Sequence, residues 1–212
     1  MAALSTCLDT ICRPGSKVII ETPGYFPIMP VLHRRGISTL ELASHPRTGL
    51  DVDEFERALK STRVDACLLM PNNHYPSGVT YPEEAQARMV ALATYHGVPI
   101  IENDIFGELG HGAAPVPSMR RFDAQDLVMQ VGSFGPTLGA TYGVAFIVNN
   151  RFRQDMMVSR LFYEERAGSV PIQEAVADFV LAPGYDRLLR RYRETLGHNM
   201  RRGLVELSQI LP

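Results

Sequence analysis

The sequence predicts an α/β fold in which helices cover both faces of a mainly parallel sheet. Short β-branched runs alternate with segments of helical periodicity, and Gly and Pro separate the two kinds of segment. The runs are almost continuously apolar, which is typical of strands that are buried on both faces. With 212 residues, 45% of them hydrophobic, and a net charge of −2, the chain is expected to fold without disulfides or metals.

The first half of the chain carries the clearest alternation. Its expected helices are 2–12, 27–35, 51–60 and 82–96, and its expected strands are 17–21, 37–42, 66–70 and 98–102. Asp51 and Glu54 fit a capping box at a helix start, and Gly97 fits a helix end. These local signals support the assignment of helices between strands.

The second half is expected to add two strands, 127–131 and 144–148, and then helices over 151–165, 170–181 and from 184 onward. The strand at 144–148 should be antiparallel, because residues 132–143 are too few for the crossover that parallel strands need. The last helix has an apolar stripe that we expect to pack on one side, made of Leu188, Leu189, Tyr192, Leu196, Met200 and Leu204.

Composition excludes several classes of function. The 21 basic and 23 acidic residues give no overall field that would attract a nucleic acid. Arginines are concentrated on the last helix, but Glu194 and Glu206 interrupt them, which favours an ordinary solvated face. No run approaches the roughly 18 apolar residues of a membrane span. Cys7, Cys12 and Cys67 lack disulfide or zinc spacing, so a cytoplasmic protein is expected.

Three polar loops follow expected strands, at 71–78, 102–109 and 132–138. Ligands of α/β sheets bind beyond the carboxyl ends of the strands, where these loops should meet. Other chemistries are weakly supported there. Gly132-Ser133-Phe134-Gly135 is not a hydrolase nucleophile elbow, and a cluster of acidic and histidine side chains matches no familiar metal spacing, namely Glu102, Asp104, Glu108 and His111.

Several ordered motifs give the chain a resemblance to a known family. They are Arg13-Pro14-Gly15, the Glu-x-Pro-x-Tyr of 21–25, Pro76-Ser77-Gly78, the Glu-x-Asp-x-x-Gly-Glu-Leu of 102–109, Gly132-Ser133-Phe134 and Pro171-Ile172-Gln173. In this order they resemble the large domain of fold-type I pyridoxal-phosphate enzymes. The similarity is to class I/II aminotransferases and, most closely, to the aminotransferase-like domains of MocR-type (GntR-family) regulators.

The resemblance implies a domain organisation. Residues 1–182 correspond to an aminotransferase-like large domain that is incomplete at its N-terminus, and residues 183–212 correspond to a linking helix toward a small domain that this chain lacks. The family places its active site at a homodimer interface, so a homodimer is expected.

The family forms a Schiff base between a lysine and pyridoxal phosphate. Its pattern resembles Ser-Phe-Ser-Lys-Thr-Leu, and here Pro136 stands at the lysine position. Proline has no amine and cannot replace that lysine. The chain contains two lysines, Lys17 and Lys60, and both are expected to be ordinary surface residues.

The resemblance also indicates which cofactor contacts have changed. Asn103 occupies the position of the aspartate that stabilises the pyridine nitrogen, and Phe106 occupies that of a cofactor-contacting tyrosine. Thr141 stands where the family carries a phosphate-binding arginine. Asp104 should point to the opposite face of an extended segment. The replacements at Asn103 and Phe106 keep the shape of the side chain, and all three replacements remove the reacting group.

What the family pattern leaves is a vestigial set of cofactor-site residues, namely Tyr25, Tyr75, Asn103, Phe106 and Ser133. We therefore expect a pseudoenzyme with no catalytic residue, no metal and no cofactor, serving as a binding, interaction or effector-type domain for a small amino-acid-like ligand. The alternative is an aminotransferase or MocR-type regulator fragment that still binds pyridoxal phosphate non-covalently, with Tyr25 stacking on the ring and the loop around Ser133 holding the phosphate.

Overall fold

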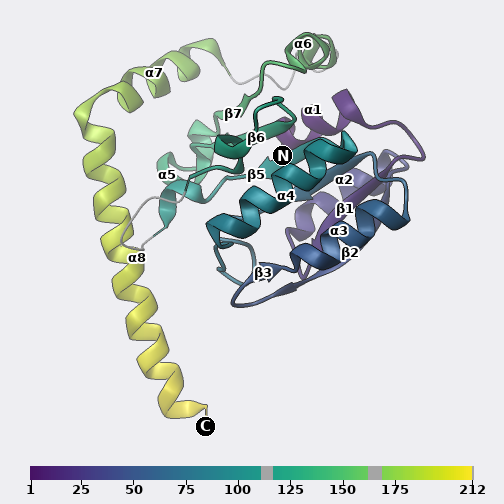
Figure 1. Cartoon of the computed structure of the whole chain (residues 1–212). Coiled ribbons are helices and arrows are strands. Elements are labelled where there is room, and N and C mark those ends of the chain that lie inside the picture. The colour runs from purple at the N-terminus through teal and green to yellow at the C-terminus, as the bar shows by residue number, and fades with distance from the viewer. Residues whose placement is uncertain (111–116, 162–168, 212) are drawn as a thin grey trace.

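The computed structural model describes residues 1–110, 117–161 and 169–211. These residues form one seven-stranded sheet of order β3-β2-β1-β4-β5-β6-β7, with helices on both faces (Figure 1). The strands are β1 Lys17–Thr22, β2 Ser38–His45, β3 Gly49–Leu50, β4 Ala66–Leu69, β5 Ile100–Asn103, β6 Val128–Ser133 and β7 Ala145–Val148. The α-helices are α1 Ala2–Ile11, α2 Met29–Arg34, α3 Val52–Ser61, α4 Glu83–His96, α5 Gly135–Leu138, α6 Arg153–Leu161, α7 Val170–Leu181 and α8 Pro183–Ile210.

The pairing of the strands confirms the predicted fold class. β2, β1, β4, β5 and β6 run parallel. β7 pairs with β6 in the antiparallel direction, with Val131 opposite Ile147. The short 3-10 helices η1 Phe26–Ile28, η2 Gly107–Leu109, η3 Met119–Phe122 and η4 Ala140–Tyr142 lie in the connections.

A second antiparallel strand, β3, pairs with β2 and was not predicted. It has two residues, too few to show a side-chain period. Gly49 begins it with a φ of 77°, and a Cβ at this position would lie 1.9 Å from the ring of Tyr81. This edge strand therefore requires glycine both for its backbone and for the close approach of the ring.

The buried strand runs divide into two cores, because successive side chains point to opposite faces of the sheet. Ile19, Cys67 and Ile100 pack with Phe55 of α3 and Met89 of α4. On the other face, alternate strand residues pack with α1 and α2, and they include Val18, Ile20, Leu68, Ile101, Leu8 and Leu32. The predicted burial of these strands on both faces is confirmed.

The predicted helix ends are confirmed as well. The Asp51 carboxylate accepts a hydrogen bond of 2.8 Å from the Glu54 backbone N–H, and Gly97 closes α4 with a left-handed φ of 66°. The helix expected over 151–165 is described as α6 up to Leu161, and its remaining residues lie outside the described part of the chain.

All three cysteines are free and buried. Burial raises the pKa of the Cys7 thiol to about 12, and burial with the nearby Asp65 carboxylate raises the pKa of Cys12 to about 11. The absence of a disulfide among them agrees with their spacing in the sequence.

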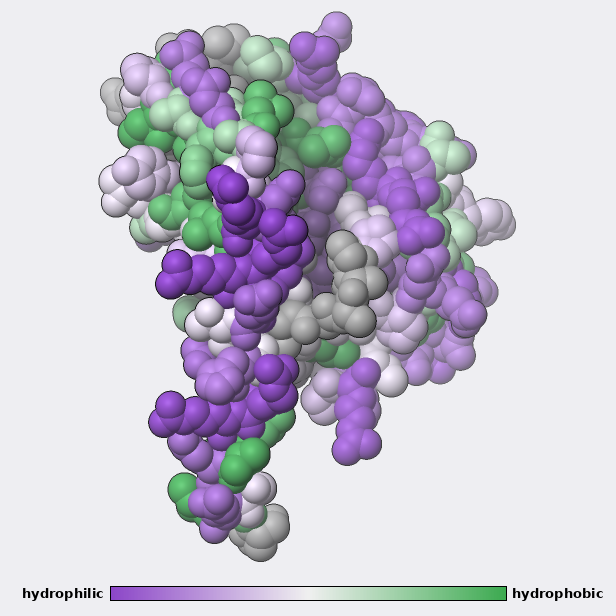
Figure 2. Space-filling model, turned by 90° about the vertical axis from the view of Figure 1, so that its left-hand side faces the viewer, coloured by the Kyte–Doolittle hydropathy of each residue, from purple (hydrophilic) through white to green (hydrophobic). Residues whose placement is uncertain are grey.

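The last helix corrects one expectation. α8 projects away from the sheet (Figure 1), and its apolar stripe is packed only near its start, where Leu189 is 6% exposed. Farther along, Leu196 is 39% exposed and Leu204 59% exposed. Figure 2 shows hydrophobic residues at the height of α7 and again toward the lower end of α8. The helical periodicity predicted the apolar face of α8 correctly. It does not indicate whether another part of the chain covers that face. No helix in the described residues is long and apolar enough to cross a membrane.

Candidate functional site

A pocket of about 190 Å³ lies where the carboxyl ends of β1, β4 and β5 meet. Its lining includes Tyr25, from the turn after β1, and Asn103, the last residue of β5. The Tyr75 ring packs edge-on against the Tyr25 ring, with 6.3 Å between their centroids. Two of the sequence-predicted residues thus line one pocket, and a third supports its aromatic wall.

Asn103 is the buried polar group of this pocket, with 1% of its surface exposed. Its Nδ2 lies 3.8 Å from the Met70 sulfur, which is a weak acceptor. Its Oδ1 has no hydrogen-bond partner among the described residues. A buried amide oxygen without a donor is uncommon in folded proteins, so Asn103 marks a place where an additional donor would be stabilised.

Asp104 turns away from Asn103, as expected for adjacent residues of an extended segment. Its carboxylate accepts hydrogen bonds from the Gln130 amide at 2.9 Å and from the Asn72 amide at 3.2 Å. Burial raises the pKa of the Asp104 carboxyl above its ordinary value. The Asp104 carboxylate is therefore held by other side chains, and Asp104 is not among the residues that line the pocket.

Phe106 and Ser133 lie near the same edge of the sheet but are not among the residues that line the pocket. The Phe106 carbonyl accepts from the Asn73 amide at 2.8 Å. The Ser133 hydroxyl accepts from the Gly135 N–H at 3.1 Å and lies 3.5 Å from the Val144 carbonyl. Ser133 is thus engaged by its own loop.

Pro136 lies in α5, which begins two residues after Ser133 at the carboxyl end of β6. Neither lysine compensates for it. Lys17 begins β1, at the opposite edge of the sheet, and the Lys60 amine pairs with the Glu56 carboxylate one turn back on α3. The described fold therefore brings no lysine of this chain to the pocket.

A buried network at the pocket was not predicted from the sequence. The Glu21 carboxylate accepts from the Met70 N–H at 2.8 Å and from the Tyr81 hydroxyl. His74 Nε2 lies 3.5 Å from the same carboxylate, and the other nitrogen of that ring lies 2.8 Å from the Ser77 hydroxyl. This network fixes the 71–81 loop on the end of β1, and only the pairing of β1 with β4 brings these residues together.

A second contact that sequence reasoning missed joins α8 to the loops after β5 and β6. The Tyr185 hydroxyl donates to the Glu108 carboxylate at 2.5 Å and lies 3.4 Å from the Thr137 hydroxyl. Arg193 donates to the Glu108 carbonyl at 2.8 Å. The start of α8 is therefore anchored next to the residues that follow Pro136.

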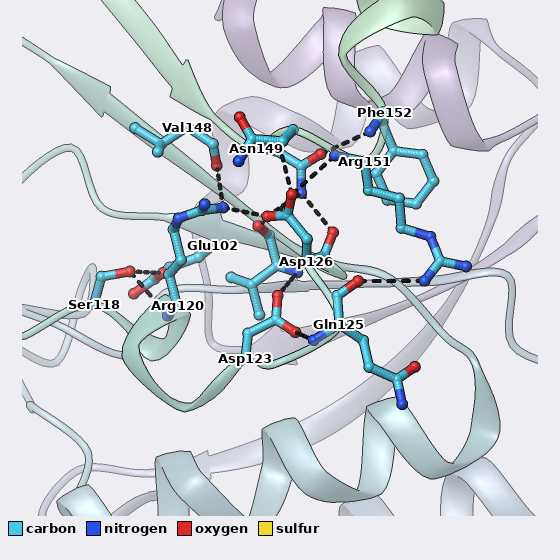
Figure 3. A network of polar contacts seen from close by, with 12 residues as sticks. Glu102, Ser118, Arg120, Asp123, Gln125, Asp126, Val148, Asn149, Arg151 and Phe152 are labelled. Carbon is cyan, nitrogen blue, oxygen red and sulfur yellow. Dashed lines mark hydrogen bonds and ion pairs between the residues drawn. The ribbon is translucent and has the colours of Figure 1, made fainter.

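The described acidic residues considered as metal ligands accept hydrogen bonds from other groups of the protein. Glu102 accepts from the Ser118 hydroxyl at 2.5 Å and the Met119 N–H at 2.9 Å, and burial raises the pKa of its carboxyl to about 7. Figure 3 shows the adjoining contacts, in which Asp126 accepts from Arg120 at 2.6 Å and from two backbone N–H groups after β7. His111 lies outside the described residues, and the described ones contain no group of three or more potential metal ligands.

The pocket does not fit a Schiff-base-bound pyridoxal phosphate. Asn103 offers a neutral amide where a carboxylate is needed to keep the pyridine nitrogen protonated. Thr141 is exposed and uncharged, and none of the lining residues in the described part of the chain is a lysine, arginine or histidine. The described lining residues of this pocket therefore supply neither the amine nor the cation that this cofactor would require.

Comparison with known proteins agrees with the fold. The model of the family "Aminotransferase class I and II" matches residues 1–208. The chain is 30% identical to the uncharacterized HTH-type transcriptional regulator YdcR of Escherichia coli, over 100% of this chain and 45% of that protein. It is 26% identical to the probable rhizopine catabolism regulatory protein MocR of Rhizobium meliloti, over 91% of this chain and 38% of that protein.

Among solved structures, kynurenine aminotransferase of Pyrococcus horikoshii superposes with a TM-score of 0.91 at 19% identity, covering 100% of this chain and 53% of that one. The chain spans about half the length of the relatives it matches. Together, the family match over nearly the whole chain and the seven-stranded sheet show that the chain belongs to the class I and II aminotransferase family.

Proposed function

We propose that this chain is an aminotransferase-like domain that has lost transaminase chemistry and acts as an effector-type module for a small ligand. The observation that carries the proposal is Pro136 in α5, at the position where the family pattern has its lysine. A Schiff base needs a primary amine, and neither Lys17 nor Lys60 lies at the pocket edge of the sheet. The other replacements, at Asn103 and Thr141, act in the same direction.

The test is the absorption spectrum of the purified chain with added pyridoxal phosphate. We expect no internal-aldimine band and no cofactor attached to a peptide of this chain after borohydride reduction. The Pro136→Lys variant should gain little activity, because Asn103 and Thr141 still lack the groups that hold the cofactor. An aldimine fixed by borohydride in the unchanged chain, or substantial transamination by Pro136→Lys alone, would contradict the proposal.

The second candidate is non-covalent binding of pyridoxal phosphate, and the placement of Tyr25 and Asn103 in one pocket favours retention of some ligand there. The same titration separates the two. Saturable binding of pyridoxal phosphate that dialysis reverses and borohydride does not fix would support this candidate. The phosphate group of the cofactor would have to compete for Ser133, because the Ser133 hydroxyl is already hydrogen-bonded within its own loop.

For the larger protein we propose the organisation that the family resemblance implies. Residues 1–182 form the large domain, 183–212 form a helix toward a further domain, and the active form is a cytoplasmic homodimer that does not contact nucleic acid through this segment. Exposed apolar residues support association, among them Phe26 at 64% and Leu181 at 85% exposure. Light scattering of the chain at micromolar concentration should give a dimer or larger species, and a clean monomer would contradict this.

A further inference from the structure

The pocket at the ends of β1, β4 and β5 has an electrostatic character opposite to the one a phosphorylated cofactor needs. The carboxylates of Glu41 and Glu21 are the charged groups among its described lining residues. Glu21 already has its own donors, whereas Glu41 is exposed on β2 beside Ile20. Any ligand that enters this pocket therefore meets a negative potential.

The neutral groups of the lining point to the same kind of ligand. Asn103 presents a buried Oδ1 that has no hydrogen-bond donor among the described residues. Tyr25 and Phe26 also line the pocket. The Tyr75 ring lies beside the Phe26 ring, with 6.0 Å between their centroids. The faces of such rings attract cations. A carboxylate acceptor, an amide acceptor and aromatic faces together form a receptor for a cation that carries N–H donors.

The remaining wall is apolar and limits the size of the ligand. Ile20, Ile28, Leu68 and Met70 line the pocket, whose volume is about 190 Å³. This space suits a body of roughly ten non-hydrogen atoms, well below the volume of drug-sized sites.

We infer that this pocket binds a small organic primary amine in its ammonium form, with a hydrophobic body and without a carboxylate. The inference rests on the proposed function, because it assumes that the pocket is not filled by a covalently held cofactor. Compared with the expected amino-acid-like ligand, this ligand keeps the ammonium group and lacks the carboxylate. The ammonium group has acceptors here, whereas a carboxylate has no cationic partner in the described lining.

The test uses isothermal titration calorimetry on the full chain at neutral pH with three probes that share a phenyl ring. Phenethylamine carries only the ammonium, phenylalanine carries both charges, and 3-phenylpropanoate carries only the carboxylate. We expect phenethylamine to bind at least tenfold more tightly than 3-phenylpropanoate, with phenylalanine at least threefold weaker than phenethylamine. Equal or tighter binding of 3-phenylpropanoate or phenylalanine, or no saturable binding of phenethylamine at millimolar concentration, would overturn the inference.

Two variants locate the binding. Glu41→Gln should weaken phenethylamine binding about two- to fivefold, the effect of an exposed ion pair, and Asn103→Leu should weaken it about tenfold or more. Glu84→Gln removes an exposed carboxylate from α4, outside the pocket lining, and should leave the affinity unchanged. Binding that is insensitive to both pocket variants would show that the amine binds elsewhere.

The outcomes remain distinguishable from those of the proposed function. An aldimine with pyridoxal phosphate would overturn the proposed function whatever the amine titration gives. No aldimine together with absent or anion-preferring binding would overturn only the ligand class.

Discussion

Two buried asparagines at opposite ends of the sheet differ in their hydrogen bonding. Asn149, just after β7, donates to the Asp126 and Val128 carbonyls at 2.7 and 3.1 Å and accepts from the Phe152 N–H at 2.8 Å. Figure 3 shows this side chain within a network of hydrogen bonds and ion pairs that also includes Asp126 and the backbone of Phe152. Asn103, at the end of β5, has among the described residues a weak contact with the Met70 sulfur and no partner for its oxygen.

The difference separates polar groups that hold the fold together from one that has no hydrogen-bond donor among the described residues. Around Asn149 and Glu102, buried polar groups hold η3, β6 and β7 together, so their loss should cost stability. Around Asn103, the described hydrogen bonding of the amide is limited to a weak contact with the Met70 sulfur, so it should hold little of the protein in place. Buried polar groups without a partner are uncommon in folded proteins, so we expect the amide of Asn103 to be available to a ligand.

Removal of Glu102 should give the largest effect on stability. In Glu102→Ala, a fully buried side chain disappears and the Met119 N–H and Ser118 hydroxyl lose their acceptor. We expect the free energy of unfolding to fall by about 3 kcal/mol, measured by urea denaturation. A loss below about 1 kcal/mol would show that the network of Figure 3 is no more important to the fold than the pocket.

The pH dependence of stability should reveal the same carboxyl group. Because burial raises the pKa of Glu102 to about 7 in the folded state, the folded protein binds more protons than the unfolded chain between about pH 4.5 and 7. The Glu102 contribution is therefore most favourable below pH 4.5 and is lost as the pH rises to 7, by up to about 3 kcal/mol.

The matched variant is Glu102→Gln, which keeps the size of the side chain and removes the titration. Its stability should change less between pH 4.5 and 7 than that of the parent chain. Asp104→Asn is the control, since the pKa of Asp104 is raised too. If Glu102→Gln keeps the full slope and Asp104→Asn loses it, the titrating group has been wrongly assigned.

The smallest effect is expected at Asn103 itself. Asn103→Leu replaces an underused amide by an apolar group of similar size, so the free energy of unfolding should rise by up to about 1 kcal/mol. The matched Asn149→Leu variant should lower it by about 2 kcal/mol, because the hydrogen bonds to the Asp126 and Val128 carbonyls and from the Phe152 N–H are lost. Equal losses in the two variants, measured by urea denaturation, would remove the distinction between the two regions.

Much of the fold could be predicted from the sequence because buried strands and capped helices are local signals. The apolar runs of β1, β4 and β5 and the cap at Asp51 are visible without knowledge of the rest of the chain. The two-residue β3 and the uncovered stripe of α8 could not be predicted, since both depend on what lies beside them in space.

The candidate site also contains some features that local sequence signals predict and others that depend on contacts between distant residues. Asn103 could be placed at the carboxyl edge because β5 ends there, and the opposite orientation of Asp104 follows from the period of a strand. The contacts of Glu21 with Tyr81, and of Tyr185 with Glu108, join residues 60 and 77 positions apart. No spacing rule relates such distant positions, so only the assembled structure reveals them.

The buried cysteines give this fold an internal reporter of its own opening. A thiol reacts with an alkylating reagent only as the thiolate, and burial holds the pKa of Cys7 and Cys12 at about 12 and about 11. Cys67 lies in β4, packs in the core with Phe55 and Met89, and is fully buried. Each thiol should therefore react at the rate at which its own part of the fold opens, so that α1 and the centre of the sheet can be followed separately in one sample.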